Sequence, residues 1–151
     1  MSHFTKLKTQ IRDKQSLVAA LVEMGFSKDQ IELHDKPVNL EGYERRGGAN
    51  PQAEIVIRKG ILGNAYNDIG FRLQEDGTYE AMISDMEMHN TTASRNALTK
   101  EFKAFGQNWL DKLNQRYALQ VVKKTARNNG YSCQEAVEQA DGSLVITVER
   151  F

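Results

Sequence analysis

The distribution of glycine is the feature of this sequence that most restricts its fold. Seven of the eleven glycines lie between residues 42 and 77, a density that suits tight turns and destabilises helices. From Ser94 onward the apolar residues recur at helical spacing, until Asn129-Gly130 stops the pattern. A turn-rich middle section of strands followed by helical segments predicts an α+β fold.

The individual elements follow from where the apolar period changes. Alternating residues predict strands at 3–11, 30–34, 54–59, 66–73, 78–84, 131–139 and 143–150. Helical spacing predicts helices between the N-cap Asp13 and Gly25, near 95–105, and from 107 to about 128. We therefore expect a single domain over 1–151, with a mostly antiparallel sheet of about six or seven strands and two or three helices packed on it. A ferredoxin-like sandwich with extra strands is the alternative.

Two turns stand out between these strands. Asp76-Gly77 and Asp141-Gly142 each join two alternating segments, and Asp-Gly is typical of a two-residue type I′ hairpin. Residues 35–52 contain both prolines and form the longest predicted loop. We expect Leu144, Ile146 and Val148 to face the core.

Composition excludes several classes of protein. Twenty Lys and Arg balance twenty Asp and Glu, so bulk charge does not favour the coating of nucleic acid. No apolar run reaches the roughly 18 residues of a membrane-spanning helix, and the N-terminus lacks the apolar core of a secretory signal. Cys133 is the sole cysteine and cannot form an internal disulfide. These observations predict a cytoplasmic location and no membrane partner.

Several segments, in order along nearly the whole chain, resemble one known family. They are residues 1–4, Gly42-Tyr43 leading into 53–57, the strand 66–71, Gln115–Ala118 and the closing Asp141-Gly142 hairpin. Together they resemble the hypothetical chloroplast reading frame thirty-five family of cyanobacteria, some algal plastids and cyanophages, a domain of unknown function. The resemblance implies the plastid stroma, or the cytoplasm of a cyanobacterium or phage host, and it supplies no reaction. After the strand at 78–84 that family tends to carry Asp followed by tryptophans, which this chain lacks.

Asp85, Glu87 and His89 form a candidate metal site. If the strand at 78–84 continues, its period of two places these three side chains on one face. Two carboxylates and an imidazole are ligands that suit Mn, Fe or Zn. The alternative is a solvated loop after the end of the strand.

A basic stripe on the 107–128 helix is the second candidate site. At 100° per residue four basic side chains fall within about 60° of one another, with Trp109 at the edge of that arc. Cations beside an aromatic ring are what phosphate or single-strand binding needs. The proposed anion site consists of Lys112, Arg116, Lys123 and Arg127, with Arg45 and Arg46 of the long loop as a second contact. The opposite arc, which we expect to be core, carries Leu110, Leu113, Tyr117, Ala118, Val121 and Val122.

No single reaction follows from these candidates. The sequence shows no nucleophile with a matched base, no glycine-rich phosphate loop and no complete set of metal ligands. We therefore favour a non-enzymatic accessory or protein-interaction module with an unidentified protein partner and no cofactor. Nucleic-acid or anion binding through the helix stripe is the alternative, and a metal-assisted hydrolase at Asp85, Glu87 and His89 is the third hypothesis. The sequence leaves the oligomeric state open.

Overall fold

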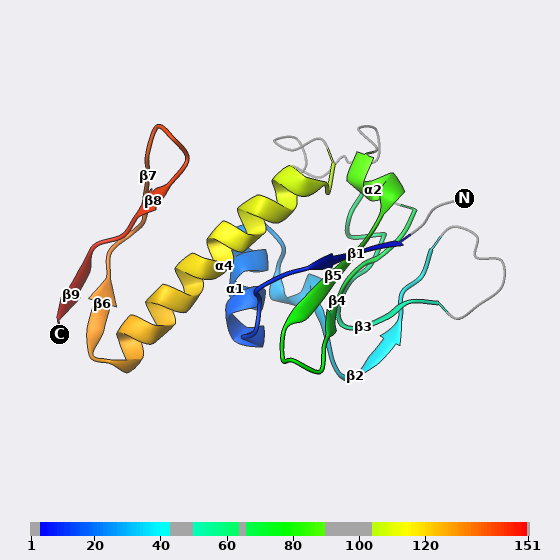
Figure 1. The fold of residues 1–151 in the computed structure, drawn as a ribbon, viewed down its shortest axis with the longest axis horizontal. Coiled ribbons are helices and arrows are strands. Elements are labelled where there is room, and N and C mark those ends of the chain that lie inside the picture. Colours follow the sequence, from blue (N-terminus) through cyan, green and yellow to red (C-terminus); the bar gives the residue numbers. More distant parts are fainter. Residues whose placement is uncertain (1–3, 43–49, 64–65, 90–103, 151) are drawn as a thin grey trace.

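A five-stranded antiparallel sheet forms the centre of the protein (Figure 1). The computed structural model describes residues 4–42, 50–63, 66–89 and 104–150. The strand order is β1-β5-β4-β3-β2. Its strands are β1 (Phe4–Lys8), β2 (Glu32–Asn39), β3 (Gln52–Ile57), β4 (Ile69–Leu73) and β5 (Tyr79–Ser84). The predicted α+β class is confirmed.

Two helices pack on this sheet and enclose the main core. They are α1 (Lys14–Glu23) and α4 (Gln107–Asn128), and the described chain also contains a 3-10 turn η1 (Lys28–Gln30) and a short α2 (Asp85–His89). In the described residues, α1 is followed by four sheet strands before the next long helix, which is not the βαββαβ order of a ferredoxin-like sandwich. Most of the predicted helix at 95–105 lies outside the described residues. The core includes Leu17, Leu21, Ile55, Phe71, Ile83, Leu110 and Leu113.

The start and end of α1 are those expected from the sequence. Asp13 is the N-cap, and its carboxylate accepts a hydrogen bond from the Ser16 N–H at 3.2 Å. Gly25 adopts a φ of +109° after the helix, and Phe26 folds back so that its N–H donates to the Leu21 carbonyl. The Phe26 side chain is buried in the core.

The strand β2 is longer than predicted, because it continues through Pro37 to Asn39. It is an edge strand, and its pairing with β3 shifts register between Leu33 and Val38. Proline lacks an N–H and is tolerated where no strand follows on the outer side. The predicted loop at 35–52 is correspondingly shorter, and residues 43–49 lie outside the described part of the chain.

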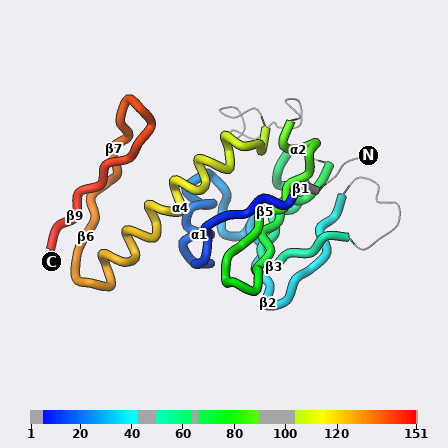
Figure 2. The backbone as a smooth tube through the Cα atoms, in the orientation of Figure 1, coloured from blue at the N-terminus to red at the C-terminus, as the bar shows by residue number. Residues whose placement is uncertain are grey.

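A two-stranded C-terminal ribbon, residues 131–150, extends away from the sheet. Figure 2 shows it beside α4, in orange to red. It pairs β6 (Tyr131–Cys133) with β9 (Val148–Arg150), and β7 (Val137–Glu138) with β8 (Leu144–Val145). The predicted hairpin is confirmed, but its predicted core face is wrong: Val148 is 41% exposed and Leu144 and Ile146 are only half-buried. The sheet does not cover this ribbon, so alternation alone does not bury it.

Both Asp-Gly hairpins close with the same three-residue turn, one residue longer than the predicted type I′ turn. Gly142 donates its N–H to the Gln139 carbonyl and has a φ of +87°, and the Asp141 carboxylate accepts from the Ser143 N–H at 3.0 Å. A turn followed by a left-handed glycine is the common three-residue hairpin connection. Gly77 repeats this geometry at a φ of +86°.

Replacing Gly142 with valine should therefore destabilise the tip of the C-terminal ribbon by about 1–2 kcal/mol, because a β-branched residue is strained at positive φ. Amide hydrogen exchange across residues 131–150 measures this loss as faster exchange. Gly142→Asn is the matched control and should cost less, since asparagine tolerates the left-handed region. Equal protection in wild type and Gly142→Val would contradict the assigned turn.

Candidate functional site

The predicted metal triad is not formed as the sequence suggested. Residues 85–89 turn into helix α2 instead of continuing β5, so a spacing of two does not place side chains on one face. Ser84 Oγ accepts from the Met86 N–H at 3.1 Å, as an N-cap serine does. The spacing from Ser84 to Glu87 is that of a capping box, which is the sequence signal for a helix start here.

Glu87 points into the protein and is already hydrogen-bonded. Its side chain is buried and accepts from the Tyr66 N–H at 2.8 Å and from Asn67 Nδ2 at 2.8 Å. Asn67 Nδ2 also donates to Ser84 Oγ, which joins the segment before β4 to the start of α2. Within the described ranges, no three His, Cys, Asp or Glu side chains come together in a group that could hold a metal ion.

The basic stripe on α4 is mostly engaged within the protein. Trp109 is fully buried and packs edge-on against Phe105, with ring centroids 5.2 Å apart, so the prediction that it borders an anion site is wrong. Lys112 Nζ lies 3.4 Å from Glu138 of the ribbon, and Arg116 Nη1 lies 3.1 Å from Glu23 of α1.

Two cations of the stripe remain accessible. Lys123 is half-buried, Arg127 is exposed, and neither forms an ion pair among the residues that the structure describes. Arg45 and Arg46 lie outside the described residues. Among the described cations of the predicted anion site, Lys123 and Arg127 are therefore the two without an ion-pair partner.

Three consecutive residues of α4 fix the helix to three other parts of the chain. Gln115 donates to the Gly142 carbonyl at the tip of the ribbon, Arg116 pairs with Glu23 at the end of α1, and the Tyr117 hydroxyl accepts from the Arg12 N–H at 2.9 Å. This segment is one of those that carry the family resemblance, and Gly142 belongs to another. Its contacts give the segment an architectural role.

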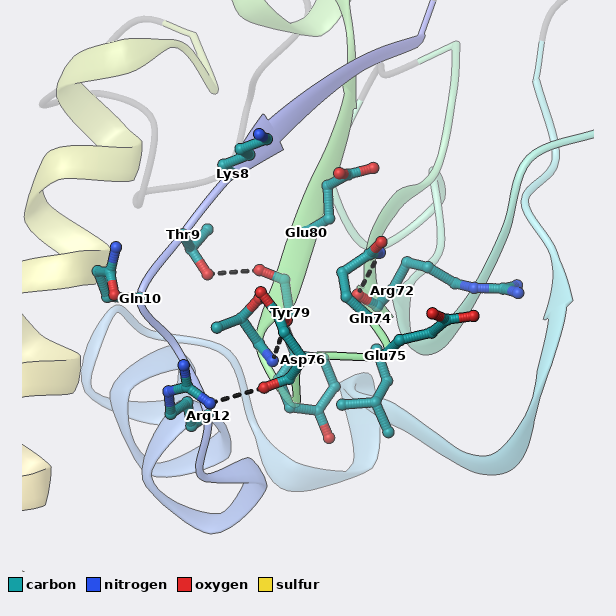
Figure 3. Close-up of a pocket in the computed structure, with 12 residues that line it drawn as sticks. Lys8, Thr9, Gln10, Arg12, Arg72, Gln74, Glu75, Asp76, Tyr79 and Glu80 are labelled. Atoms are coloured by element: carbon teal, nitrogen blue, oxygen red, sulfur yellow. Dashed lines mark hydrogen bonds between the residues drawn. The ribbon is translucent and has the colours of Figure 1, made fainter.

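A polar hollow of about 780 Å³ lies between the end of β1 and the β4–β5 hairpin (Figure 3). Arg12 donates to the Asp76 carbonyl at 2.7 Å, and the Asp76 carboxylate accepts from the Thr78 N–H at 2.9 Å. Lys8 and Glu80 bring opposite charges from neighbouring strands. Because charges of both signs line the hollow, it does not concentrate the potential that an ionic substrate requires.

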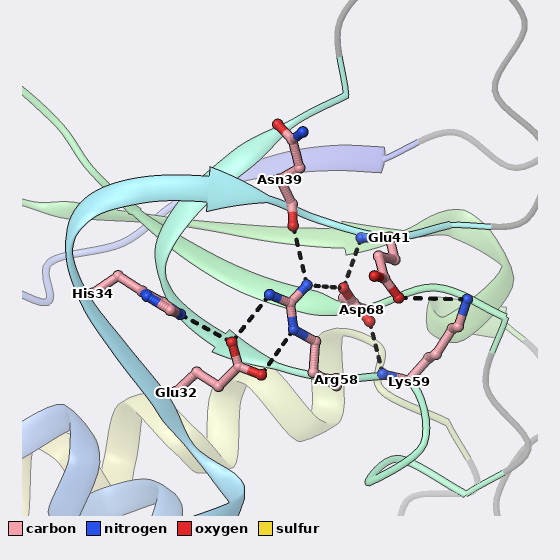
Figure 4. A network of polar contacts seen from close by, with 7 residues as sticks. All are labelled: Glu32, His34, Asn39, Glu41, Arg58, Lys59 and Asp68. Atoms are coloured by element: carbon pink, nitrogen blue, oxygen red, sulfur yellow. Dashed lines mark hydrogen bonds and ion pairs between the residues drawn. The ribbon is translucent and has the colours of Figure 1, made fainter.

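A network of ion pairs centred on Arg58 fastens the edge strand β2 to the rest of the sheet (Figure 4). Arg58 forms a bidentate pair with Glu32, through Nε at 2.9 Å and Nη2 at 3.0 Å. Its third nitrogen, Nη1, donates to Asp68 at 2.8 Å and to the Asn39 carbonyl at 3.0 Å. Arginine suits this task because its five donors lie in a fixed plane.

Asp68 is the buried centre of this network. Its side chain is 0% exposed, and besides Arg58 it accepts from the backbone N–H of Glu41 at 2.6 Å and of Lys59 at 2.8 Å. All three donors hold the carboxylate between the end of β2 and the start of β4. Because its carboxylate is bound by three donors of the protein itself, Asp68 acts as a structural anchor.

The Glu32 carboxylate links this network to pH. The hydrogen bonds from Arg58, and to a lesser extent from His34, outweigh partial burial and lower the pKa of Glu32 below its ordinary value. A group whose pKa is lower in the folded state stabilises the fold above its unfolded-state pKa, and this stabilisation is lost as the pH falls through the folded-state pKa.

We expect the wild-type unfolding free energy to fall more steeply below about pH 4.5 than that of Glu32→Gln. Urea titrations at pH 7 and pH 3 measure the difference, and parallel declines would contradict it.

An apolar groove runs along the outward face of the second half of α4. Two adjoining hollows of about 670 and 470 Å³ share Val121, Val122 and Thr125. Gln10, Arg12 and Asp13 border the groove on the α1 side, and Tyr131 and Val148 border it on the ribbon side. We call this surface the α4 groove, and α4 lines it with Tyr117, Ala118, Val121, Val122, Lys124, Thr125, Ala126, Asn128 and the C-cap Asn129.

The α4 groove corrects part of the predicted core arc. Leu110 and Leu113 are buried as expected, but Ala118 is exposed and Val122 is 43% exposed. With 22 residues α4 is about 33 Å long, whereas the 10 residues of α1 span about 15 Å. Because Asp13, the N-cap of α1, pairs with Lys124, it is the last turn of α4 that extends past α1, as Figure 1 shows.

Comparisons with known proteins confirm the family resemblance. The family model described as protein of unknown function (DUF1257) matches residues 20–147. The uncharacterized protein ycf35 of Pyropia yezoensis is 28% identical over 153 residues, which cover 100% of this chain and 98% of that protein. Proteins of the same name from Cyanophora paradoxa and Guillardia theta are 26% and 28% identical, with the same coverage. No solved structure gives a significant match.

Proposed function

Because the chain belongs to the family described as protein of unknown function (DUF1257), its role has to be sought on its own surface, and we propose that it is a non-enzymatic interaction module that docks a helix of another protein in the α4 groove. The groove floor from Ala118 to Asn129 spans about three turns of helix. An amphipathic helix laid in an apolar groove is a common mode of protein recognition.

The observation that carries this proposal is that the α4 groove is mostly apolar, with charge only from Arg12, Asp13 and Lys124 at its border. Arg12 at its edge bonds the Asp76 carbonyl, and Lys124 pairs with the Asp13 carboxylate at 3.0 Å. Because the charges at this border are few and Lys124 is paired with Asp13, the fitting partner is a helix with small, uncharged side chains on one face.

The polar parts of the surface support the same conclusion. In the network around Arg58 and in the hollow beside Arg12, charged groups bind one another and the backbone instead of converging on a common point. Among the described residues, no helix is both long and apolar enough to cross a membrane. The family resemblance supports a place in a cyanobacterium, a plastid or a phage-infected host.

The docking proposal is tested by comparing three tagged chains expressed in the native host: wild type, Val122→Arg and Val137→Arg. Val137 is 60% exposed on the ribbon outside the groove, so it is a matched control. We expect a protein that is recovered with wild type and Val137→Arg and reduced at least about tenfold with Val122→Arg, the effect of losing a central contact.

That protein, once purified, should bind the wild-type chain with a negative heat-capacity change, the mark of apolar burial. Equal recovery with all three chains, or recovery of no protein with the wild type, would contradict the proposal.

Anion binding through Lys123 and Arg127 is a second candidate, favoured by their lack of ion-pair partners among the described residues. The double variant Lys123→Glu/Arg127→Glu should then abolish binding of short single-stranded DNA or RNA while leaving the thermal melt unchanged. Binding through two phosphate contacts should weaken with salt with a log–log slope of about 1.4 for single strands. Affinity no tighter than about 10⁻⁴ M at physiological salt would exclude this candidate.

A further inference from the structure

The two edges of the central sheet differ in how they are protected against a further strand. On the β2 edge, Pro37 lacks a backbone N–H, and the pairing with β3 shifts register between Leu33 and Val38. The bidentate pair of Arg58 with Glu32 also fixes this edge. Proline and bulges are devices by which proteins prevent pairing at the edge of a sheet. The β2 edge is therefore unsuited to binding another strand.

The β1 edge has neither proline nor bulge. Phe4–Lys8 pair with residues 84 to 80 of β5 without a register shift. β1 is the last strand in the sheet order, and among the described elements it packs chiefly against β5. In a strand the N–H and C=O groups of every second residue point toward the same edge. About half of the backbone groups of β1 therefore point toward its free edge, where one more strand can pair.

Two lysines determine the charge of the β1 edge. Lys6 and Lys8 are exposed, and alternation places them on the face opposite to Leu7, which packs against the main core. Neither lysine forms an ion pair within the described part of the chain. Glu80 is the ladder partner of Lys8, but Figure 3 shows its carboxylate extending to the side away from Lys8. The β1 edge therefore presents two cations that no described carboxylate neutralises.

Like charges disfavour a second copy of this chain at the β1 edge. If two β1 strands paired along their whole length, Lys6 and Lys8 of one chain would lie beside the same residues of the other. Like charges opposite each other on neighbouring strands are destabilising, and lysines on edge strands prevent such pairing. The same two cations attract a strand that carries carboxylates, because opposite charges on neighbouring strands are stabilising.

We propose that the free edge of β1 binds an extended acidic segment of another protein, which adds a strand to the sheet. Backbone hydrogen bonds supply the affinity in this mode of recognition, and side chains at alternate positions supply the specificity. Residues on one face of a strand are about 6.8 Å apart, so Asp or Glu at every second position of the segment meets Lys6 and Lys8. This site is on a different element from the α4 groove and does not depend on the docking function proposed there.

Calorimetric titration of the full chain with two synthetic peptides tests the proposal. Each peptide has about eight residues, enough to cover β1, and alternates Thr with either Glu or Lys. We expect the Glu peptide to bind with a dissociation constant of about 100 µM or tighter, and the Lys peptide to bind at least about tenfold more weakly. With the Glu peptide bound, hydrogen exchange should slow at alternate amides of β1.

Charge variants locate the site. Lys6→Glu/Lys8→Glu should raise the dissociation constant of the Glu peptide at least about tenfold, because like charges then lie opposite each other. The control Lys28→Glu/Lys36→Glu makes the same change in net charge at exposed lysines of η1 and β2, and should leave the constant within about twofold. Thermal melts check that each variant is folded, and Lys6→Gln/Lys8→Gln is the second variant should Lys6→Glu/Lys8→Glu fail to fold.

N-methylation distinguishes backbone pairing from attraction between charges alone. A methyl group on every second amide of the Glu peptide blocks the hydrogen bonds along one of its edges and leaves the other edge unchanged. Of two peptides, one methylated on the Glu amides and one on the Thr amides, we expect one to keep its affinity within about threefold and the other to lose at least about tenfold. Equal affinities of the two methylated peptides would overturn strand addition.

Three further results would overturn the proposal. The first is no binding of the Glu peptide up to about 1 mM. The second is binding that Lys6→Glu/Lys8→Glu and Lys6→Gln/Lys8→Gln leave unchanged. The third is tighter binding of a single-stranded DNA of about eight nucleotides, lost in the same variants, which would identify the β1 edge as a phosphate site.

Discussion

Replacing Asp68 with alanine should lower the free energy of unfolding by about 3–5 kcal/mol, because the change removes the buried partner of an ion pair. Arg58 keeps its pair with Glu32, but the N–H groups of Glu41 and Lys59 lose their acceptor. Each unsatisfied buried donor costs about 1–3 kcal/mol. Asp68→Asn should fall between alanine and wild type, since one amide oxygen cannot serve three donors.

Urea unfolding measures these losses, and Glu41→Ala is the matched control. The Glu41 side chain is 65% exposed and reaches Lys59 only at 3.9 Å, so its removal should cost less than about 1 kcal/mol. The N–H of residue 41 still reaches Asp68 in that variant. A loss below about 1 kcal/mol for Asp68→Ala would show that the network does not anchor the edge strand.

Gly70→Ala should be the second strongly destabilising change. A Cβ on this β4 residue would lie 2.7 Å from the Ala53 Cβ and 2.8 Å from Leu40 Cδ2, closer than packed carbons approach. Leu40 and Ala53 belong to a small buried cluster with Val56 and Met82, so the neighbours have little space to move into. Overpacking of this kind costs about 1–3 kcal/mol, and Gly70→Val should cost more.

Gly60→Ala is the control for the glycine change. Nothing lies within 4 Å of a Cβ built at position 60, and its φ is not in the left-handed region. Its substitution should be neutral or slightly stabilising, because alanine restricts the unfolded chain. Equal melting temperatures for Gly60→Ala and Gly70→Ala would contradict the close packing of Leu40 and Ala53 against Gly70.

The sequence predicted those parts of the fold that local chemistry decides. Asp13 and Gly25 delimit α1 through their own hydrogen bonding and backbone freedom, and Asn129-Gly130 ends α4 in the same way. The Asp-Gly turns were also predictable, although their length was wrong by one residue, because carboxylate bonds to Ser143 and Thr78 stabilise the longer turn.

The parts that depend on distant elements could not be predicted. Alternation in the ribbon suggested a buried face, but burial needs a covering layer, and within the described residues the ribbon packs chiefly against α4. The basic stripe suggested an anion site, yet the acidic partners of Lys112 and Arg116 come from residues 138 and 23. The α4 groove was assigned to the core because periodicity identifies an apolar face without indicating where the covering elements end.

The hydrogen bond between the Arg12 N–H and the Tyr117 hydroxyl joins residues 105 positions apart. At about 5–20 residues per second, translation makes the first of these groups roughly 5–20 s before the second. Strand β1 likewise waits for β5, with Phe4 pairing to Ser84. The N-terminal strand and helix therefore leave the ribosome with their apolar faces uncovered, and these faces stay uncovered until α4 has been synthesised.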